Sequence, residues 1–264
     1  MENIMVKYEE LTRLVCQIAR EAGVYLRTEQ KKLDEKQVEQ KQTHDYVSYV
    51  DKTSEKQIVK ALKEILPEVG FQTEEATARR SGEEKFWWVI DPLDGTTNYI
   101  HGGGPYAISI ALRNEREVLL GVVYDVWTDE CFYAWKCGGA WLNGEQIHVK
   151  PQHSIEEAIL GIEFPYNPVY RPTGLKLIDH FSGYCGAIRM NGSAALSLCW
   201  VASGRWDGWL EQYLGPWDFM AGMLIVREAE GKVTNYEGEE DMLEGNAVVA
   251  SNGTIHNDLL NALK

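Results

Sequence analysis

The sequence lacks a long hydrophobic run. Its longest nearly apolar stretch, residues 219–226, includes a glycine, whereas a membrane-spanning helix needs about 20 apolar residues. Residues 1–10 show no apolar core of a signal peptide. We therefore expect a cytoplasmic protein with no membrane partner.

Cysteine is also scarce, and its spacing is uninformative. The chain has five cysteines, an odd number, with no Cys-x-x-Cys pair and no cysteine–histidine spacing typical of a zinc site. Buried, reduced thiols are the expectation, rather than disulfides or zinc ligands. The positions are Cys16, Cys131, Cys137, Cys185 and Cys199.

The chain has far fewer basic than acidic residues. Lysine and arginine number 26 against 40 acidic residues, a formal net charge of −14. Such a chain repels the phosphates of nucleic acids and of anionic lipids, so neither is an expected partner. A small anionic substrate stays compatible, because bound cations can invert the local field.

The hydrophobic pattern predicts an α+β fold. Apolar residues at helical spacing predict helices at 8–26, 54–66, 193–202, 217–230 and 255–263. Short apolar runs between turn residues predict strands at 86–90, 106–113, 118–124, 130–135, 158–162 and 206–210, and near 233 and 248. The charged stretch 29–42 is expected to be exposed. We expect two parts, 1–148 and 149–264, in one compact unit.

The densest chemical signal is DPLDGTTN at residues 91–98. The strand before it is expected to end at Asp91, and the turn brings the Leu93 carbonyl and the Asp94 carboxylate into the same space. Such hard oxygen ligands suit Mg²⁺ or Mn²⁺ better than zinc. Gly95 and Thr96 follow with free amides at a predicted helix start, where a phosphate oxygen would bind well.

Two further acidic features have alternative explanations when taken alone. The pair Glu74-Glu75 is typical of a solvated loop, and Asp218 at the start of an apolar helix is typical of a cap. Their occurrence together with the 91–98 motif favours a shared metal site.

The motifs together resemble those of a known family. Residues 87–101, WWVIDPLDGTTNYIH, and 217–222, WDFMAG, are similar to the two signatures of the inositol monophosphatase family, part of the Mg²⁺-dependent, lithium-sensitive phosphatases. Residues 45–55, 73–75 and 137–144 resemble further family segments. The resemblance implies a layered α-β-α-β-α fold, a phosphomonoesterase that activates water with two or three Mg²⁺ ions, and a homodimer.

The resemblance also assigns metal and catalytic roles. Glu74, Asp91 and the Leu93 carbonyl match ligands of a first metal, and Asp91, Asp94 and Asp218 match ligands of a second. Most of these metal ligands lie in the N-terminal part, and Asp218 lies in the C-terminal part. Thr96 matches the residue that orients the attacking water, and Asp51 matches its acidic partner. The implied catalytic group is Thr96, Asp51, Glu74 and Asp94.

Substrate-binding roles follow in the same way. The amides of Gly95 and Thr96 match phosphate donors, while Ser193, Ala194 and Glu211 match positions that hold the alcohol. Asp94 and Asp218 belong to the same implied binding set.

Some positions depart from the family pattern. Thr73 stands where the family usually has glycine. Tyr46 and Ser48 replace more usual residues, and Gln40 stands where a lysine is expected. These differences leave the neighbourhood of a third metal open.

The substrate is less determined than the reaction. Thr97-Asn98 resembles the inositol phosphatase form of the motif, and Glu211 suits a polyol. Fructose 1,6-bisphosphate, NADP and adenosine 3′,5′-bisphosphate stay open as alternatives. A metal- or phosphometabolite-binding protein without turnover is the alternative from another class.

Overall fold

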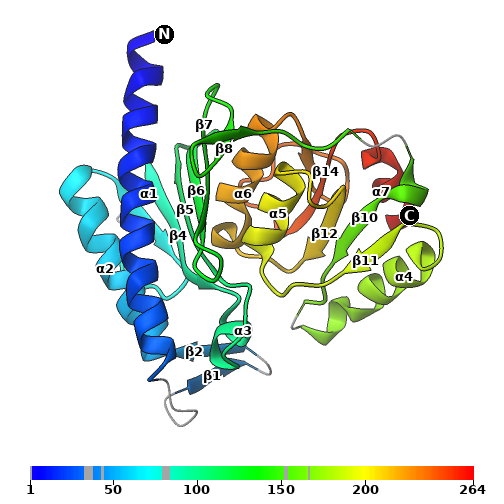
Figure 1. Ribbon diagram of the computed structural model, residues 1–264, viewed down its shortest axis with the longest axis horizontal. Coiled ribbons are helices and arrows are strands. Elements are labelled where there is room, and N and C mark those ends of the chain that lie inside the picture. The colour runs from blue at the N-terminus through cyan, green and yellow to red at the C-terminus, as the bar shows by residue number, and fades with distance from the viewer. Residues whose placement is uncertain (1, 33–37, 43–44, 79–83, 152–153, 166) are drawn as a thin grey trace.

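The computed structural model describes residues 2–32, 38–42, 45–78, 84–151, 154–165 and 167–264 (Figure 1). Its largest sheet has seven strands in the order β3-β4-β5-β6-β7-β8-β9. Neighbouring strands are antiparallel except β3 and β4, which run parallel. The bounds are β3 Gly70–Thr73, β4 Trp87–Asp94, β5 Ala107–Arg113, β6 Val118–Asp125, β7 Glu130–Trp135, β8 Ala140–Leu142 and β9 Glu145–Ile147.

Helices cover both faces of this sheet. The long helix α1 (Glu2–Gln30) and α2 (Tyr49–Ile65) pack on one face, and α5 (Ala194–Ala202) and α6 (Pro216–Glu228) lie on the other (Figure 1). The face toward α6 carries small residues: a Cβ on Gly121 would lie 2.7 Å from the backbone oxygen of Ala221. Glycine at that position therefore permits the close approach of helix and sheet.

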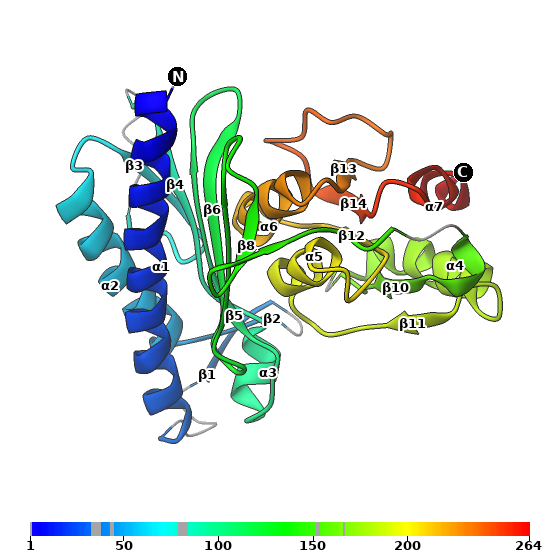
Figure 2. The same ribbon diagram turned by 45° about the horizontal axis from the view of Figure 1, so that its top comes forward.

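A second sheet of five strands lies beyond α5 and α6, in the order β11-β10-β12-β14-β13. Strand β10 runs parallel to both neighbours, and the remaining pairs are antiparallel. Helices α4 (Arg171–Phe181) and α7 (His256–Leu263) cover its outer face (Figure 2). The bounds are β10 Ile159–Ile162, β11 Ala187–Arg189, β12 Gly208–Gln212, β13 Lys232–Thr234 and β14 Ala247–Ser251.

These elements form five layers: α1 and α2, the seven-stranded sheet, α5 and α6, the five-stranded sheet, then α4 and α7 (Figure 2). The arrangement confirms the predicted α-β-α-β-α fold. Helices α5 and α6 are buried almost all round because both sheets cover them. No described helix has the length and apolar character needed to span a bilayer.

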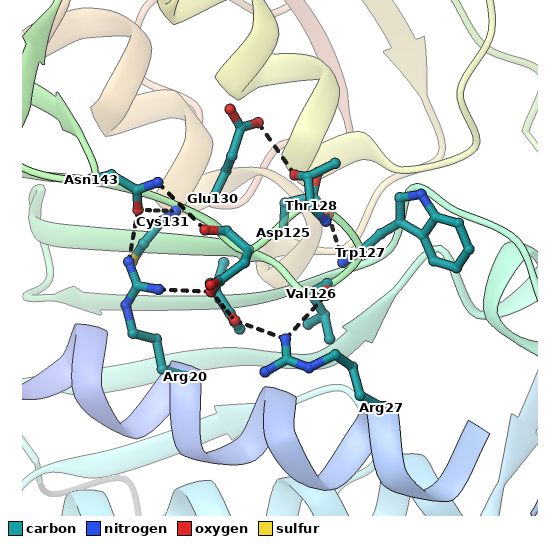
Figure 3. A network of polar contacts seen from close by, with 11 residues as sticks. Arg20, Arg27, Asp125, Val126, Trp127, Thr128, Glu130, Cys131 and Asn143 are labelled. Carbon is teal, nitrogen blue, oxygen red and sulfur yellow. Dashed lines mark hydrogen bonds and ion pairs between the residues drawn. The ribbon is translucent and has the colours of Figure 1, made fainter. Parts of the chain in front are cut away.

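A polar network fastens α1 to strand β6 and to the turns that follow β6 and β8 (Figure 3). Arg20 donates to the carboxylate of Asp129 at 2.8 Å and to the side-chain oxygen of Asn143 at 2.7 Å. Arg27 donates to the hydroxyl of Tyr124 at 2.8 Å and to the carbonyl of Val126 at 3.1 Å. Helix α1 is thus held in place by directed hydrogen bonds as well as by its apolar stripe.

Several predicted boundaries were wrong. Helix α2 begins at Tyr49 rather than at residue 54, and strand β4 continues through Asp94 rather than ending at Asp91. The charged stretch 29–42, expected only to be exposed, contains strand β1 (Val38–Gln42), which pairs with β2 (Asp45–Ser48). All five cysteines are free, as predicted, but only Cys131 and Cys199 are buried; Cys16 and Cys185 are half-buried and Cys137 is exposed.

Candidate active site

An irregularity in strand β4 brings two aspartates together. Asp91 lies opposite Ser109 of β5 and Asp94 lies opposite Ala107, so a step of three residues on β4 matches a step of two on β5. Such a bulge rotates the residues after it. Both carboxylates therefore line the same cavity, although residues three apart in a regular strand would face opposite sides.

A left-handed turn follows directly. Gly95 has φ of 84°, and a Cβ there would lie 2.9 Å from the carbonyl oxygen of Pro105. Glycine therefore fits this position for two reasons. The turn leads into α3 (Thr96–Ile100), where the Thr96 hydroxyl donates to the Leu93 carbonyl at 2.8 Å and lies 3.4 Å from Asp51 Oδ1. Asp51, on α2, is buried behind the cavity wall.

Asp218 serves as a helix cap and also faces the cavity. Its Oδ2 accepts a hydrogen bond from the Gly215 amide at 2.6 Å, at the first turn of α6. The Ser109 hydroxyl donates to the carbonyl of Trp217 at 2.9 Å, which ties the start of α6 to β5. The cap and the cavity-lining interpretations of Asp218 are therefore compatible.

Glu74 reaches the cavity from the loop after β3. The Glu74 amide donates to the Ile90 carbonyl at 3.1 Å, beside the end of β4. The loop is held from behind by Glu55 of α2, the last residue of the family-like segment 45–55, to which the sequence reasoning assigned no role. Its carboxylate accepts from the Thr73 hydroxyl at 2.8 Å and from the Thr77 amide at 2.7 Å. The threonine that departs from the family pattern is thus used to hold this loop.

Four carboxylates from three distant segments line one cavity of about 550 Å³. Burial raises the pKa of Asp91 well above its usual range, and the nearby charges of Glu74, Asp94 and Asp218 raise it further. Burial also raises the pKa of Asp94, to about 7, although Ser193 and Ala195 donate to its carboxylate. The four carboxylates therefore repel one another unless a proton or a cation binds among them.

The donor set fits a hard divalent cation. Carboxylates and the Leu93 carbonyl are the oxygen ligands that Mg²⁺ and Mn²⁺ prefer. Within the described segments, no three Asp, Glu, His or Cys side chains already converge on one point as a closed ligand cage. Asp91 accepts from the Leu93 amide at 2.8 Å and Asp218 accepts from Gly215, so part of each carboxylate is turned toward its own loop.

Residues of the C-terminal half form the cavity wall opposite the β4 aspartates. Glu211, at the end of β12, and Ala194 line it, whereas Ser193 lies just behind. Burial raises the pKa of Glu211, and the charges of Glu163, Asp218 and Asp94 raise it further. Thr97 and Asn98, which the sequence analysis used only to narrow the substrate, also line the wall. The wall residues that sequence reasoning did not place in the site are Glu163, Phe164, Pro165, Gly192, Tyr213, Leu214, Gly215, Trp217 and Asn246.

One signal in the sequence could have found Glu163. It directly follows a predicted strand, and in sheets with parallel strands the carboxyl ends are where ligands bind. Trp217 packs on the core and also lines the cavity. Trp87 and Trp88 are buried in the core, and His101 is exposed.

Comparison with known proteins finds a family model that matches nearly the whole chain. The profile described as the inositol monophosphatase family covers residues 7–264. The chain belongs to the inositol monophosphatase family. Membership implies a phosphatase, and it accounts for the joint presence of the two signature motifs and the layered fold.

Several relatives share nearly the full length of this family member. An inositol-1-monophosphatase of Mesorhizobium japonicum is 35% identical over 255 residues, 96% of each chain. The Nus factor SuhB of Escherichia coli K12 is 37% identical over 244 residues, 92% of this chain and 91% of that one. The crystal structure of the extragenic suppressor protein suhB from Bartonella henselae superimposes with a TM-score of 0.92 at 35% identity, covering 97% and 98%.

One predicted region lies outside what the structure describes. Only the backbone is described for Gln40, in β1, and for Tyr46 and Ser48, in β2. The third-metal neighbourhood therefore stays a prediction.

Proposed function

We propose that this protein is a Mg²⁺-dependent phosphomonoesterase acting on a small phosphorylated alcohol, with inositol monophosphate as the favoured substrate. The observation that carries the proposal is the gathering of Glu74, Asp91, Asp94 and Asp218 around one cavity, next to the Gly95-Thr96 turn. The cavity of about 550 Å³ falls in the range of small-molecule sites, roughly 300–1,000 Å³.

Glu74, Asp91, the Leu93 carbonyl, Asp94 and Asp218 would hold the metal. When bound, two or three Mg²⁺ ions neutralise the phosphate and activate a water molecule for attack. The clustered carboxylates supply the negative charge that makes such ions bind there, because the charges of Glu74, Asp94 and Asp218 raise the pKa of Asp91 when no cation is present.

The remaining residues along the cavity would have separate roles. Thr96, with its hydroxyl beside Asp51, would orient the attacking water. The amides of Gly95 and Thr96 would bind phosphate oxygens. Ser193, Ala194 and Glu211 would hold the alcohol, and a carboxylate such as Glu211 accepts hydrogen bonds from hydroxyl groups.

A related structure supports a phosphorylated polyol. The structure described as inositol monophosphate-bound SaIMPase-II superimposes with a TM-score of 0.79 at 26% identity, covering 95% of this chain and 92% of that one. The same protein is also described with bound 2′AMP. We therefore keep a nucleotide phosphate as the second substrate candidate.

The test is phosphate release with Mg²⁺ from inositol 1-phosphate, 2′-AMP, NADP, fructose 1,6-bisphosphate and adenosine 3′,5′-bisphosphate. We expect inositol 1-phosphate to give the highest kcat/KM. Binding of these esters without release of phosphate from any of them would instead identify a binding protein and contradict the proposal.

A further inference from the structure

Glu163 lies at the carboxyl end of β10, next to the end of β12. The Glu163 amide donates to the Leu210 carbonyl at 3.3 Å, and its side chain lines the cavity beside Glu211. The side chain is 9% exposed. Burial raises the pKa of Glu163, so a carboxylate here is costly without a compensating interaction.

The compensating interaction is with a turn on a different segment. Glu163 Oε1 accepts hydrogen bonds from the Asn191 amide at 2.6 Å and from the Gly192 amide at 3.2 Å. One carboxylate oxygen thus holds two consecutive backbone donors. Gly192 has φ of 73°, which favours glycine at this turn.

The signature loop holds the same turn from the other side. Asn98 Nδ2 donates to the Asn191 carbonyl at 2.8 Å and to the Pro105 carbonyl at 2.7 Å. A Cβ on Gly192 would lie 3.3 Å from Asn98 Nδ2, so the two segments are in close contact. The turn is therefore clamped between Glu163 and the loop that carries the acidic motif.

The turn continues into the helix start that contacts Asp94. Asn191 Oδ1 accepts from the Ser193 amide at 2.9 Å. The Ser193 hydroxyl donates to Asp94 Oδ2, and the Ala195 amide donates to the same oxygen at 2.9 Å. A short hydrogen-bonded path thus leads from Glu163 through residues 191–195 to the Asp94 carboxylate.

We propose that Glu163 is a positioning residue that sets the 191–195 turn, and through it the orientation of Asp94 and Ser193. The inference rests on the proposed phosphatase function and adds a residue that the family motifs do not include. An error of about 1 Å in the placement of a reacting group can cost about a hundredfold in rate. Removing the acceptor oxygen should therefore lower kcat more than it changes KM.

The chain offers matched variants. Glu163→Gln keeps an oxygen that can accept from both amides, Glu163→Asp keeps the charge but withdraws the acceptor, and Glu163→Ala removes it. Asp207→Asn is the control, because Asp207 is a buried carboxylate that accepts from the Ile159 amide at 2.8 Å, at the other end of β10 and outside the cavity.

The experiment measures kcat, KM and Tm for inositol 1-phosphate with Mg²⁺, and amide hydrogen exchange across residues 189–196. We expect Glu163→Ala and Glu163→Asp to lower kcat by about 10- to 100-fold, with KM changed less than kcat and faster exchange at 191–192. Glu163→Gln should restore kcat to within a few-fold of wild type. Asp207→Asn should lower Tm and leave kcat unchanged.

Two results would overturn the inference. One is a folded Glu163→Asp protein with wild-type kcat and wild-type exchange at 191–192. The other is a Glu163→Gln protein as impaired as Glu163→Ala, since charge rather than positioning would then be at work. If wild-type protein releases no phosphate from any ester, the proposed function fails, while the exchange data still test whether Glu163 holds the turn.

Discussion

The two walls of the cavity differ in how many hydrogen bonds the protein itself donates to their carboxylates. On the β4 side, Asp91 and Asp94 accept hydrogen bonds from nearby amides and a hydroxyl. On the opposite side, Glu163 accepts from two backbone amides, but no described residue donates a hydrogen bond to the carboxylate of Glu211, although burial raises its pKa. The first wall is organised before a ligand arrives. The second is organised at Glu163 but presents one acceptor, Glu211, that only a ligand or water can satisfy.

The largest expected effect tests the wall formed by the β4 aspartates. Asp91→Asn keeps the shape of the side chain and its place in β4 but removes a charge from the centre of the cluster. We expect kcat/KM to fall by about 10³-fold or more, with an unchanged circular dichroism spectrum. The control is Asp207→Asn, a buried carboxylate outside the cavity. An active Asp91→Asn enzyme would contradict the proposed metal site.

The next prediction concerns cation binding to the same wall. Because the carboxylates repel one another, Mg²⁺ should stabilise the folded state. At a concentration 100 times its Kd, a ligand adds about 2.7 kcal/mol to the unfolding free energy, which for a chain of this size raises Tm by roughly 5–10 °C. Asp91→Asn should lose most of this shift. A wild-type Tm that is constant up to millimolar Mg²⁺ would refute cation binding at the cluster.

A third prediction concerns the stability of the fold at a residue away from the site. His256 is buried on α7, where its ring contacts the hydroxyls of Thr234 and Ser251, and burial lowers its pKa to about 4. Between about pH 6.5 and 4 the unfolded chain binds the extra proton, so stability falls as the pH falls. We expect this histidine to cost roughly 2 kcal/mol between pH 7 and pH 5.

The measurement is urea unfolding of wild type and of His256→Gln at both pH values. The variant should lose less stability over the interval than wild type, because glutamine does not titrate there. Equal losses in the two proteins would show that carboxylates account for the whole pH dependence.

The smallest expected effect tests Glu211, the unsatisfied acceptor of the second wall. Glu211→Gln keeps the size of the side chain and removes the charge that would accept substrate hydroxyls. Hydrogen bonds to charged groups contribute about 1.5–3 kcal/mol, so we expect KM for inositol 1-phosphate to rise about tenfold, with kcat within about twofold of wild type. A phosphate ester without further hydroxyls, such as p-nitrophenyl phosphate, provides the control. An equal change with both esters would argue against hydroxyl recognition by Glu211.

Elements with a strong local pattern were predictable, and others were not. Helix α6 shows a continuous apolar pattern and was expected within two residues of its observed ends, Pro216 and Glu228. Helix α4 was missed, because Pro172 and Gly174 interrupt its pattern and much of its surface is exposed. Strands β8, β9 and β11 were also missed, since each has only three residues and depends on its neighbours for hydrogen bonds.

The same distinction holds within the site. The acidic motif is contiguous, so its oxygen ligands could be inferred from residue types and spacing. Glu163 was not singled out, because one glutamate after a predicted strand is a weak signal among 40 acidic residues. Glu55 was noted only as the end of the family-like segment 45–55, with no role assigned. Their roles arise from contacts with Thr73 and Thr77 and with Asn191 and Gly192, which lie far from them along the chain.

By itself, the sequence determined the α+β class, the acidic charge balance and the chemical type of the groups at the site, because these depend on composition, periodicity and short motifs. Only the tertiary structure decided that Glu74, the β4 aspartates and Asp218 line one cavity, and that Glu163 and Glu211 stand across from them. The physical reason is that sheet pairing and the packing of α5 and α6 between the two sheets bring distant segments together, and no local pattern specifies those distances.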